Sequence, residues 1–455
     1  MRENKNGIFK SKWGFILACV GSAVGMANVW GFPYKVGSNG GGAFLIAYLF
    51  FIILFGNIGL AAEYAIGRRS GTGTLGAYAY AWSTRKKKGF ERVGKIVGWI
   101  PLAGSMCIAI GYAVIVSYVL KAFTQAVDGT LMSVKPDVWF GTFAFNKFSV
   151  IVFHALVIAG TLLTLIFGAN SIEKTNKIMM PLFFILFLIL AVRVATLPGV
   201  FEGYKFLFKP DWSLLLKPWT WIWAMGQAFF SLSITGSGMI VYGAYLDKKE
   251  DIVKASKNTA LFDTIAAFVA ALVMIPACFA YNLEPGGGPG LLFVSLPTVL
   301  QNMPGGRIFA VILFVAVVFA GISSLQNMFE AVGESLMHVF PKLKRVPMLS
   351  GLLIVCFGVG VFMEPIAETE GAILGGWGPW MDLVSIYIIP IGATIGAVSW
   401  FWIMKKEDLM DEINKGAGKI HGDLWYGMGK WLYTPLAAIL CIIALSPAGD
   451  RKSVV

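Results

Sequence analysis

The sequence has little charge for its length. Only 14% of its 455 residues are Asp, Glu, Lys or Arg, against roughly 25% in ordinary globular proteins, whereas 57% are hydrophobic. So few charges cannot keep so much apolar surface in water, which excludes a soluble enzyme or a string of soluble domains. The formal net charge of +12 therefore does not indicate a nucleic-acid binder, and we expect no nucleic-acid partner.

Cysteine and histidine are also scarce. The three histidines lie far apart and form no ligand motif, and the five cysteines lack the paired spacing of zinc sites or disulfide frameworks. No metal centre built from these residues is indicated, and we expect the cysteines to be small core residues. The cysteines are Cys19, Cys107, Cys278, Cys356 and Cys441.

Apolar stretches of about 20 residues, each long enough to cross a bilayer, recur along the whole chain. Lipid cannot satisfy an open backbone and the alternation typical of a β-barrel is absent, so the sequence predicts an all-α membrane protein. We predict about eleven spans, at residues 13–36, 43–66, 96–123, 149–168, 178–198, 218–245, 259–283, 307–338, 347–364, 381–403 and 431–447.

Basic residues predict the orientation of these spans. With a cytoplasmic N-terminus, about 26 of the 37 Lys and Arg residues fall in inner segments, as the positive-inside rule requires. The polar N-terminus leads into a full span without a small-residue cleavage site, so we do not expect a removable signal peptide. We expect a multi-pass protein of the cell (inner) membrane, with an extracellular C-terminus because the number of spans is odd.

Glycine and proline bracket a short apolar stretch between the seventh and eighth spans. Residues 284–290 read EPGGGPG, and MPGGR follows at residues 303–307. Such turn residues around a short apolar segment indicate an outer hairpin or lid that packs on the helix bundle. A lid in turn implies a cavity beneath it.

Two predicted spans contain segments with low helix propensity. The first has GSAVGMAN at residues 21–28, and the sixth has FSLSITGSG at residues 230–238. Small residues also permit close helix packing, which is the alternative explanation for either segment alone. Two such segments, each heading a set of five spans, match inverted repeats with discontinuous helices 1 and 6. The repeats would cover about residues 13–198 and 218–403, with an extra helix at about 431–447.

Eight stretches of the chain form a recognisable series, at residues 13–18, 21–28 with 32–34, 39–44, 63–68, 227–233, 263–264, 284–289 and 320–324. In this order they resemble the neurotransmitter:sodium symporter family and particularly its bacterial amino-acid transporter branch. The resemblance implies a leucine-transporter-type fold, a single transmembrane transporter domain over residues 1–455, and sodium-coupled import by alternating access.

The resemblance implies two sodium sites and no organic cofactor. The first would use the substrate carboxylate together with Ala23, Asn28, Ser231 and Asp263. The second would join the first and eighth spans through Gly21, Val24, Ala320, Ser323 and Ser324. Taken singly, each of these serines has an ordinary alternative role in helix packing.

Asp263 is costly inside a membrane and indicates a function, although a structural hydrogen bond between helices is the alternative. Chloride-dependent relatives commonly carry Asn at the matching position, with a chloride ion supplying the charge. Tyr48, Gln227 and Ser231 match residues of that chloride site. Because Asp263 already carries a charge, we expect chloride-independent transport.

The substrate site would lie between the two interrupted helices. Gly25 matches a position where amine transporters carry Asp, which favours a zwitterionic amino acid, and the mostly apolar contacts favour a neutral hydrophobic one. Gly236 stands where relatives often carry Phe, which suggests a larger pocket for branched-chain or aromatic substrates. The implied substrate-binding residues are Ala23, Gly25, Met26, Ile108, Tyr112, Phe230, Ser231, Ser233, Gly236, Ser324 and Met328.

The chain departs from the family at both gates. Gly31 replaces the arginine of the outer gate, whose acidic partner would match Asp382, while Asn6 and His338 replace the inner ion pair. Phe9 aligns with the usual tryptophan. We therefore expect differently built gates, held by aromatic and hydrogen-bond contacts.

These departures leave a second hypothesis open, a sodium-dependent amino-acid-binding membrane sensor with impaired transport. A membrane enzyme has no support, because no catalytic cluster is present, and a channel suits two tight ion sites poorly. We expect Glu63, Glu330 and Glu334 to brace helices or to belong to gate networks. The expected partners are a neutral amino acid and the lipid bilayer, with the protein a monomer or weak homodimer.

Overall fold

The computed structural model describes residues 9, 11–286, 290–366 and 376–446, and every regular element within these ranges is a helix. The predicted all-α class is therefore confirmed. Asn6, part of the predicted lid at residues 287–289, and the C-terminal residues 447–455 lie outside the described residues.

The helices of the first half are α1 (Lys12–Ala23), η1 (Ala27–Gly31), α2 (Phe32–Ser38), α3 (Gly42–Asn57), α4 (Gly59–Ser70), α5 (Thr74–Ser83), α6 (Phe90–Asp128), α7 (Thr130–Ser133), α8 (Pro136–Ala144), α9 (Ile151–Leu163), α10 (Ala169–Ala195), α11 (Val200–Phe208) and α12 (Trp212–Leu215).

The helices of the second half are α13 (Pro218–Ser231), α14 (Gly238–Ala244), α15 (Ile252–Ala280), η2 (Leu291–Ser295), α16 (Leu296–Asn302), α17 (Gly306–Val339), α18 (Arg345–Gly360), η3 (Val361–Met363), α19 (Trp377–Asp382), η5 (Leu383–Ile388), α20 (Ile389–Val398), η6 (Ser399–Ile403), α21 (Lys406–Asn414), α22 (Asp423–Met428), η7 (Gly429–Tyr433) and α23 (Thr434–Leu445).

Eight helical segments in the described ranges are long and apolar enough to cross a membrane, or nine with the bent pair that contains α1 and α2. The remaining predicted spans correspond to α9 and to the interrupted pair α13 and α14. Helix α9 has only 13 residues, because the chain turns at residues 164–168 and Gly168 adopts a positive φ of 59°. The number of eleven spans stays a prediction.

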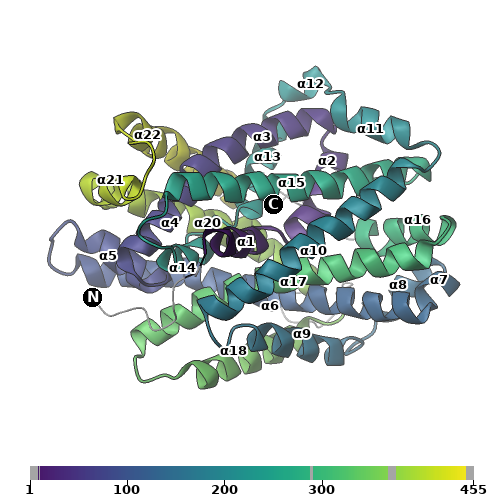
Figure 1. Ribbon diagram of the computed structural model, residues 1–455, viewed down its shortest axis with the longest axis horizontal. Coiled ribbons are helices and arrows are strands. Elements are labelled where there is room, and N and C mark those ends of the chain that lie inside the picture. Colours follow the sequence, from purple (N-terminus) through teal and green to yellow (C-terminus); the bar gives the residue numbers. More distant parts are fainter. Residues whose placement is uncertain (1–8, 10, 287–289, 367–375, 447–455) are drawn as a thin grey trace.

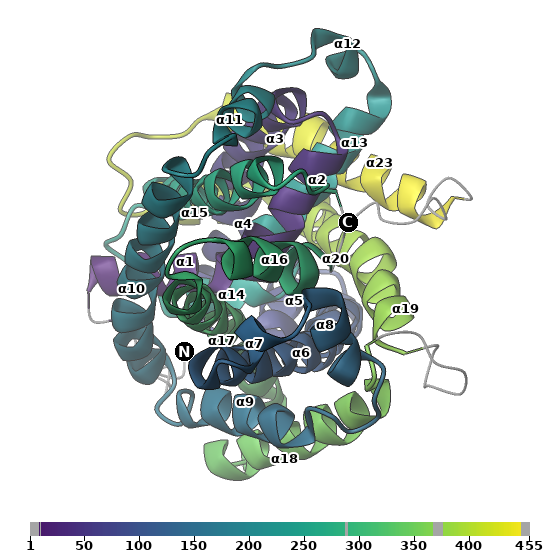
Figure 2. The same cartoon turned by 90° about the vertical axis from the view of Figure 1, so that its right-hand side faces the viewer.

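Long helices run between two ends of the molecule in Figure 1. The left end carries α5 and α21 and is called here the α5 end. The right end carries α7, α8 and α16 and is called the α16 end. Helices η2 and α16 form the apolar arm expected of the outer hairpin, and Figure 2 views them from that end.

Helix α1 lies in the interior of the bundle. It packs against α10, α15 and α17, and Figure 2 shows α10 and α17 beside it. Nine of its twelve residues are buried. An interrupted backbone is tolerated in a membrane only where protein or a cavity surrounds it, and this packing supplies such an environment.

Candidate functional site

The first helix break lies at residues 24–26. Helix α1 ends because Val24 is extended, and the path bends by 56° before the chain continues as η1 and α2. A Cβ atom added at Gly25 would lie 2.3 Å from both Ser324 Oγ and Tyr112 Oη. Only glycine lets the backbone approach these two hydroxyl groups so closely.

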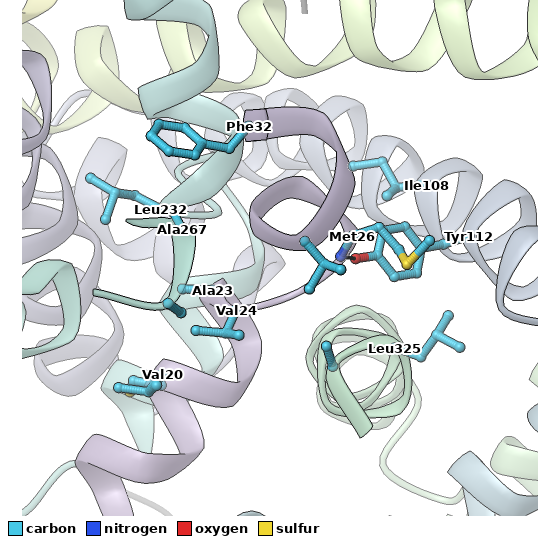
Figure 3. Packing of buried hydrophobic residues seen from close by; sticks show 14 of the residues in the cluster. Val20, Ala23, Val24, Met26, Phe32, Ile108, Tyr112, Leu232, Ala267 and Leu325 are labelled. Carbon is cyan, nitrogen blue, oxygen red and sulfur yellow. Dashed lines mark hydrogen bonds between the residues drawn. The ribbon is translucent and has the colours of Figure 1, made fainter. Parts of the chain in front are cut away.

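Tyr112 stabilises this break directly. Its hydroxyl oxygen accepts the backbone N–H of Met26, which lies beyond the last turn of α1 and has no helical partner. Figure 3 shows the chain leaving α1 near Ala23, passing Val24 and reaching the Tyr112 ring at Met26. Helix α6 therefore positions the first break.

The second break lies at residues 232–237, between α13 and α14. Ser233 and Gly236 have positive φ angles of 52° and 73°, so the backbone turns sharply and leaves main-chain groups without helical partners. Glu63 Oε1 accepts the N–H of Gly236 at 2.8 Å. The carboxylate on α4 therefore braces the second break, as expected for Glu63.

A polar cluster joins the two interrupted helices. Ser231 Oγ donates to Asp263 Oδ2 at 2.7 Å, and Asn28 Nδ2 donates to Asp263 Oδ1 at 2.7 Å. Tyr48 Oη donates to Ser231 Oγ at 3.1 Å. All four side chains are fully buried, so these donors replace the water that the carboxylate has lost. The structure thus brings together Asn28, Ser231 and Asp263 of the first predicted sodium site.

The second predicted sodium site lies where α1 meets α17. Ser324 Oγ is 3.3 Å from the carbonyl oxygen of Val24, and Ser323 Oγ donates to the Ala320 carbonyl at 3.0 Å. A Cβ atom added at Gly21 would lie 3.1 Å from Ser323 Cβ. The five residues predicted for this site therefore lie close together, and oxygen atoms dominate among their polar groups.

A small cavity of about 40 Å³ lies between the two breaks. Seven predicted substrate-binding residues line it: Ala23, Ile108, Tyr112, Phe230, Ser233, Ser324 and Met328. Four others, Gly25, Met26, Ser231 and Gly236, lie outside the lining. A Cβ atom at Gly236 would instead meet Gly392 O at 2.4 Å, which places this glycine against α20.

Sequence reasoning missed half of the lining residues. Ser105 lies one turn before Ile108 on α6, so helical periodicity could have found it. Ile389 comes from α20, and no local pattern in the sequence indicates that α20 reaches the cavity. The missed residues are Ser22, Ala27, Ser105, Thr235, Gly238, Asn327 and Ile389.

Few atoms surround Gly31, the position at which the arginine of the outer gate is missing. A Cβ atom at Gly31 would meet only Met26 O at 3.8 Å and Gln227 Oε1 at 3.9 Å. One turn further on, Lys35 is 3% exposed. Its ammonium group lies 5.9 Å from the centre of the Trp223 ring and makes no hydrogen bond within the described residues. A buried lysine thus lies close to the position that lacks the arginine.

At the α5 end, aromatic contacts close the bundle. Phe9 donates its N–H to the Tyr245 carbonyl at 3.2 Å. Its ring packs edge-on against Phe15, Tyr242 and Tyr245, with centroids 5.6 to 5.9 Å apart. These contacts are of the aromatic and hydrogen-bond kind that the sequence predicts for a differently built gate, and their role as a gate stays a prediction.

An ion pair that the sequence did not predict lies beside these rings. Arg345, at the start of α18, pairs with Glu330 of α17, and the Tyr245 hydroxyl donates to the same carboxylate. Glu334 accepts the backbone N–H of Gly73, which precedes α5. Glu330 and Glu334 thus brace the α5 end, while His338 lies in the last turn of α17.

Comparisons with known proteins agree with this geometry. The family model described as the Sodium:neurotransmitter symporter family matches residues 6–142 and 139–448. The chain is 32% identical to the uncharacterized sodium-dependent transporter YhdH of Bacillus subtilis (strain 168), over 98% of this chain and 99% of that protein. It is 28% identical to the uncharacterized sodium-dependent transporter MJ1319 of Methanocaldococcus jannaschii, over 94% of this chain and 88% of the relative.

A solved structure resembles the whole fold. The crystal structure of MhsT in complex with L-phenylalanine superposes with a TM-score of 0.86 at 32% sequence identity, covering 96% of this chain and 99% of MhsT.

Proposed function

The chain belongs to the sodium:neurotransmitter symporter family, and from this premise we propose that it imports neutral, hydrophobic amino acids by sodium-coupled alternating access. One observation carries the proposal: two helix breaks face each other across a small cavity, and a cluster of oxygen-rich side chains lies beside it. Sodium dependence and a multi-pass membrane fold follow from family membership.

The first proposed sodium ion lies among Ala23, Asn28, Ser231 and Asp263. The Asn28 amide nitrogen faces Asp263, while its Oδ1 accepts the N–H of Gly25 at 3.1 Å. A sodium ion requires oxygen ligands, so its binding would turn the Asn28 amide. The N–H of Gly25 would then be released next to the substrate cavity, where a substrate carboxylate can accept it.

The second proposed sodium ion lies among Gly21, Val24, Ala320, Ser323 and Ser324. The Ser324 hydroxyl bridges the carbonyl oxygens of Ser22 and Val24 at 3.4 and 3.3 Å. A cation among these oxygens would replace that weak bridge with direct ligation.

The proposed substrate is a branched-chain or aromatic amino acid. Ile108, Phe230, Met328 and Ile389 give the cavity an apolar wall, and no acidic side chain stands at Gly25 to bind an amine that lacks a carboxylate. The Tyr112 hydroxyl is the proposed donor to the substrate carboxylate. MhsT, a structural relative, was solved with L-phenylalanine.

Chloride independence is part of the proposal. The Asp263 carboxylate receives two hydrogen bonds and supplies the negative charge that a chloride ion would otherwise bring. Tyr48 donates its hydroxyl hydrogen to Ser231 at 3.1 Å.

The proposed topology rests on charge. We propose one transporter domain over residues 1–455, with repeats at about 13–198 and 218–403, a cytoplasmic N-terminus and an extracellular C-terminus in the cell (inner) membrane. The α5 end carries Arg68, Arg69 and Arg85 and would face the cytoplasm. A monomer or weak homodimer is proposed.

The deciding experiment is uptake of labelled neutral amino acids into proteoliposomes, with sodium or choline outside. Saturable, concentrative uptake that requires sodium and collapses with a sodium ionophore is the expected result. Sodium-dependent thermal stabilisation by amino acids without uptake would instead favour the sensor hypothesis.

A further inference from the structure

Asn176 of α10 carries a buried oxygen atom without a donor. The side chain is fully buried, and within the described ranges Oδ1 has no hydrogen-bond partner. A buried acceptor that lacks a donor is unfavourable and requires an explanation, such as a bound ion.

This oxygen points at α1. A Cβ atom added at Gly21 would lie 2.0 Å from Asn176 Oδ1 and 3.1 Å from Ser323 Cβ. Asn176 of α10 therefore meets Gly21 of α1 close to Ser323 of α17. Gly21 and Ser323 are two of the five residues of the second proposed sodium site.

Hydrogen bonds fix the orientation of the Asn176 amide. Its Nδ2 donates to the Ile172 carbonyl at 2.9 Å and to Gln326 Oε1 at 2.7 Å. If the amide were flipped, Oδ1 would face the Ile172 carbonyl, a backbone group that can only accept. The oxygen must therefore be the atom that faces Gly21.

Gln326 is fixed by its own contacts. Its Nε2 donates to Thr164 Oγ1 at 2.6 Å and to Thr175 Oγ1 at 2.9 Å. Both threonine hydroxyls donate onward to backbone carbonyls, so they act as acceptors towards Gln326. Hydrogen bonds therefore run from the Asn176 amide nitrogen to Gln326, from Gln326 to the two threonine hydroxyls, and from these to backbone carbonyls. None of these groups donates to Asn176 Oδ1.

The groups around Asn176 Oδ1 favour a bound cation over a hydrogen-bond donor as its partner. The Ser323 hydroxyl already donates to Ala320, and the Ser324 hydroxyl is directed to the carbonyls of Ser22 and Val24. Both serine hydroxyls are thus directed to carbonyl oxygens and not to Asn176 Oδ1. A hard cation such as sodium prefers oxygen ligands.

We propose that Asn176 is an oxygen ligand of the second sodium ion, so that this site joins α10 to α1 and α17. The inference rests on the proposed sodium coupling and adds a third helix to the site. Occupancy of the site would then hold α10 against α1.

The test is a sodium titration of the thermal unfolding of the purified full-length protein, in choline chloride of constant ionic strength and without amino acid. The first site needs the substrate carboxylate, so the second should dominate this response. We compare the wild type with Asn176→Ala, with Ser323→Ala as a predicted-ligand variant, and with Gln326→Leu as the matched control. Gln326→Leu disturbs the same network but leaves the Asn176 amide bonded to Ile172.

Asn176→Ala and Ser323→Ala should each raise the half-saturating sodium concentration about tenfold, and Gln326→Leu less than about twofold. An unchanged value in Asn176→Ala, or equal shifts in Asn176→Ala and Gln326→Leu, would overturn the inference. If Asn176→Ala is not monodisperse, Asn176→Ser takes its place. The serine side chain fills more space than alanine but is shorter than asparagine, so it does not reach the ion. A wild type that does not respond to sodium would contradict the proposed function itself.

Discussion

The hydroxyl of Ser231 donates to Asp263 and so ties the last residue of an interrupted helix to the middle of an uninterrupted one. Helix α13 ends at Ser231, whereas α15 continues for 29 residues around Asp263. The Asp263 carboxylate therefore lies close to both the second helix break and the first proposed sodium ion. A substitution by Asn removes its charge and keeps the size of the side chain, so the effect of the charge can be tested by itself.

Asp263→Asn should convert chloride-independent uptake into chloride-dependent uptake. The amide preserves the size of the side chain but removes the negative charge, so an external anion must supply it. The measurement is sodium-driven uptake in chloride and in gluconate. Wild-type uptake that falls when gluconate replaces chloride would contradict the role given to Asp263.

Gly25→Ala should abolish amino-acid binding. The new methyl group would lie 2.3 Å from Tyr112 Oη and Ser324 Oγ, so the break must shift away from both hydroxyls. Gly160→Ala is the matched control, because no atom lies within 4 Å of its added Cβ, and it should leave binding unchanged. Binding is measured by ligand-induced thermal stabilisation. Retained affinity in Gly25→Ala would show that the break tolerates a side chain.

Tyr112→Phe should weaken substrate affinity about tenfold while leaving the protein folded. The substitution keeps the ring but removes the hydroxyl, which accepts from Met26 and is the proposed donor to the substrate carboxylate. The concentration dependence of uptake reports the change. A loss of thermal stability without a change in apparent affinity would assign Tyr112 to the helix break alone.

Lys35→Met should raise the thermal stability of the protein. The lysine ammonium is buried and has no salt bridge within the described residues, and an apolar side chain of similar length removes its desolvation cost. Lys217→Met, at the start of α13, is a control for a change of charge alone. A less stable Lys35→Met protein would indicate that the ammonium has a stabilising partner.

The sequence predicts the helical class and the place of each helix break, because both depend on local composition. Hydropathy marks α6, α15 and α17, and glycine-rich segments mark the two breaks. The end of α9 at Leu163 was not predicted, since the following residues are as apolar as a span although the chain turns at residues 164–168.

Within the site, the recurring motifs locate the oxygen cluster around Asp263. The sequence did not identify residues whose role depends on packing between helices that are far apart in the chain. Ile389 reaches the cavity from α20, and Asn176 is a single polar residue in a long helix whose orientation depends on Gln326, 150 positions away.

The break at residues 24–26 also has a consequence for the evolution of the protein. Main-chain carbonyls such as that of Val24 are present whatever side chain a position carries, so most point mutations cannot delete them. Side chains that line the cavity, such as Ile108 and Met328, change with a single substitution. Substrate preference can therefore diverge among descendants of this gene while the main-chain part of the proposed ion sites is retained.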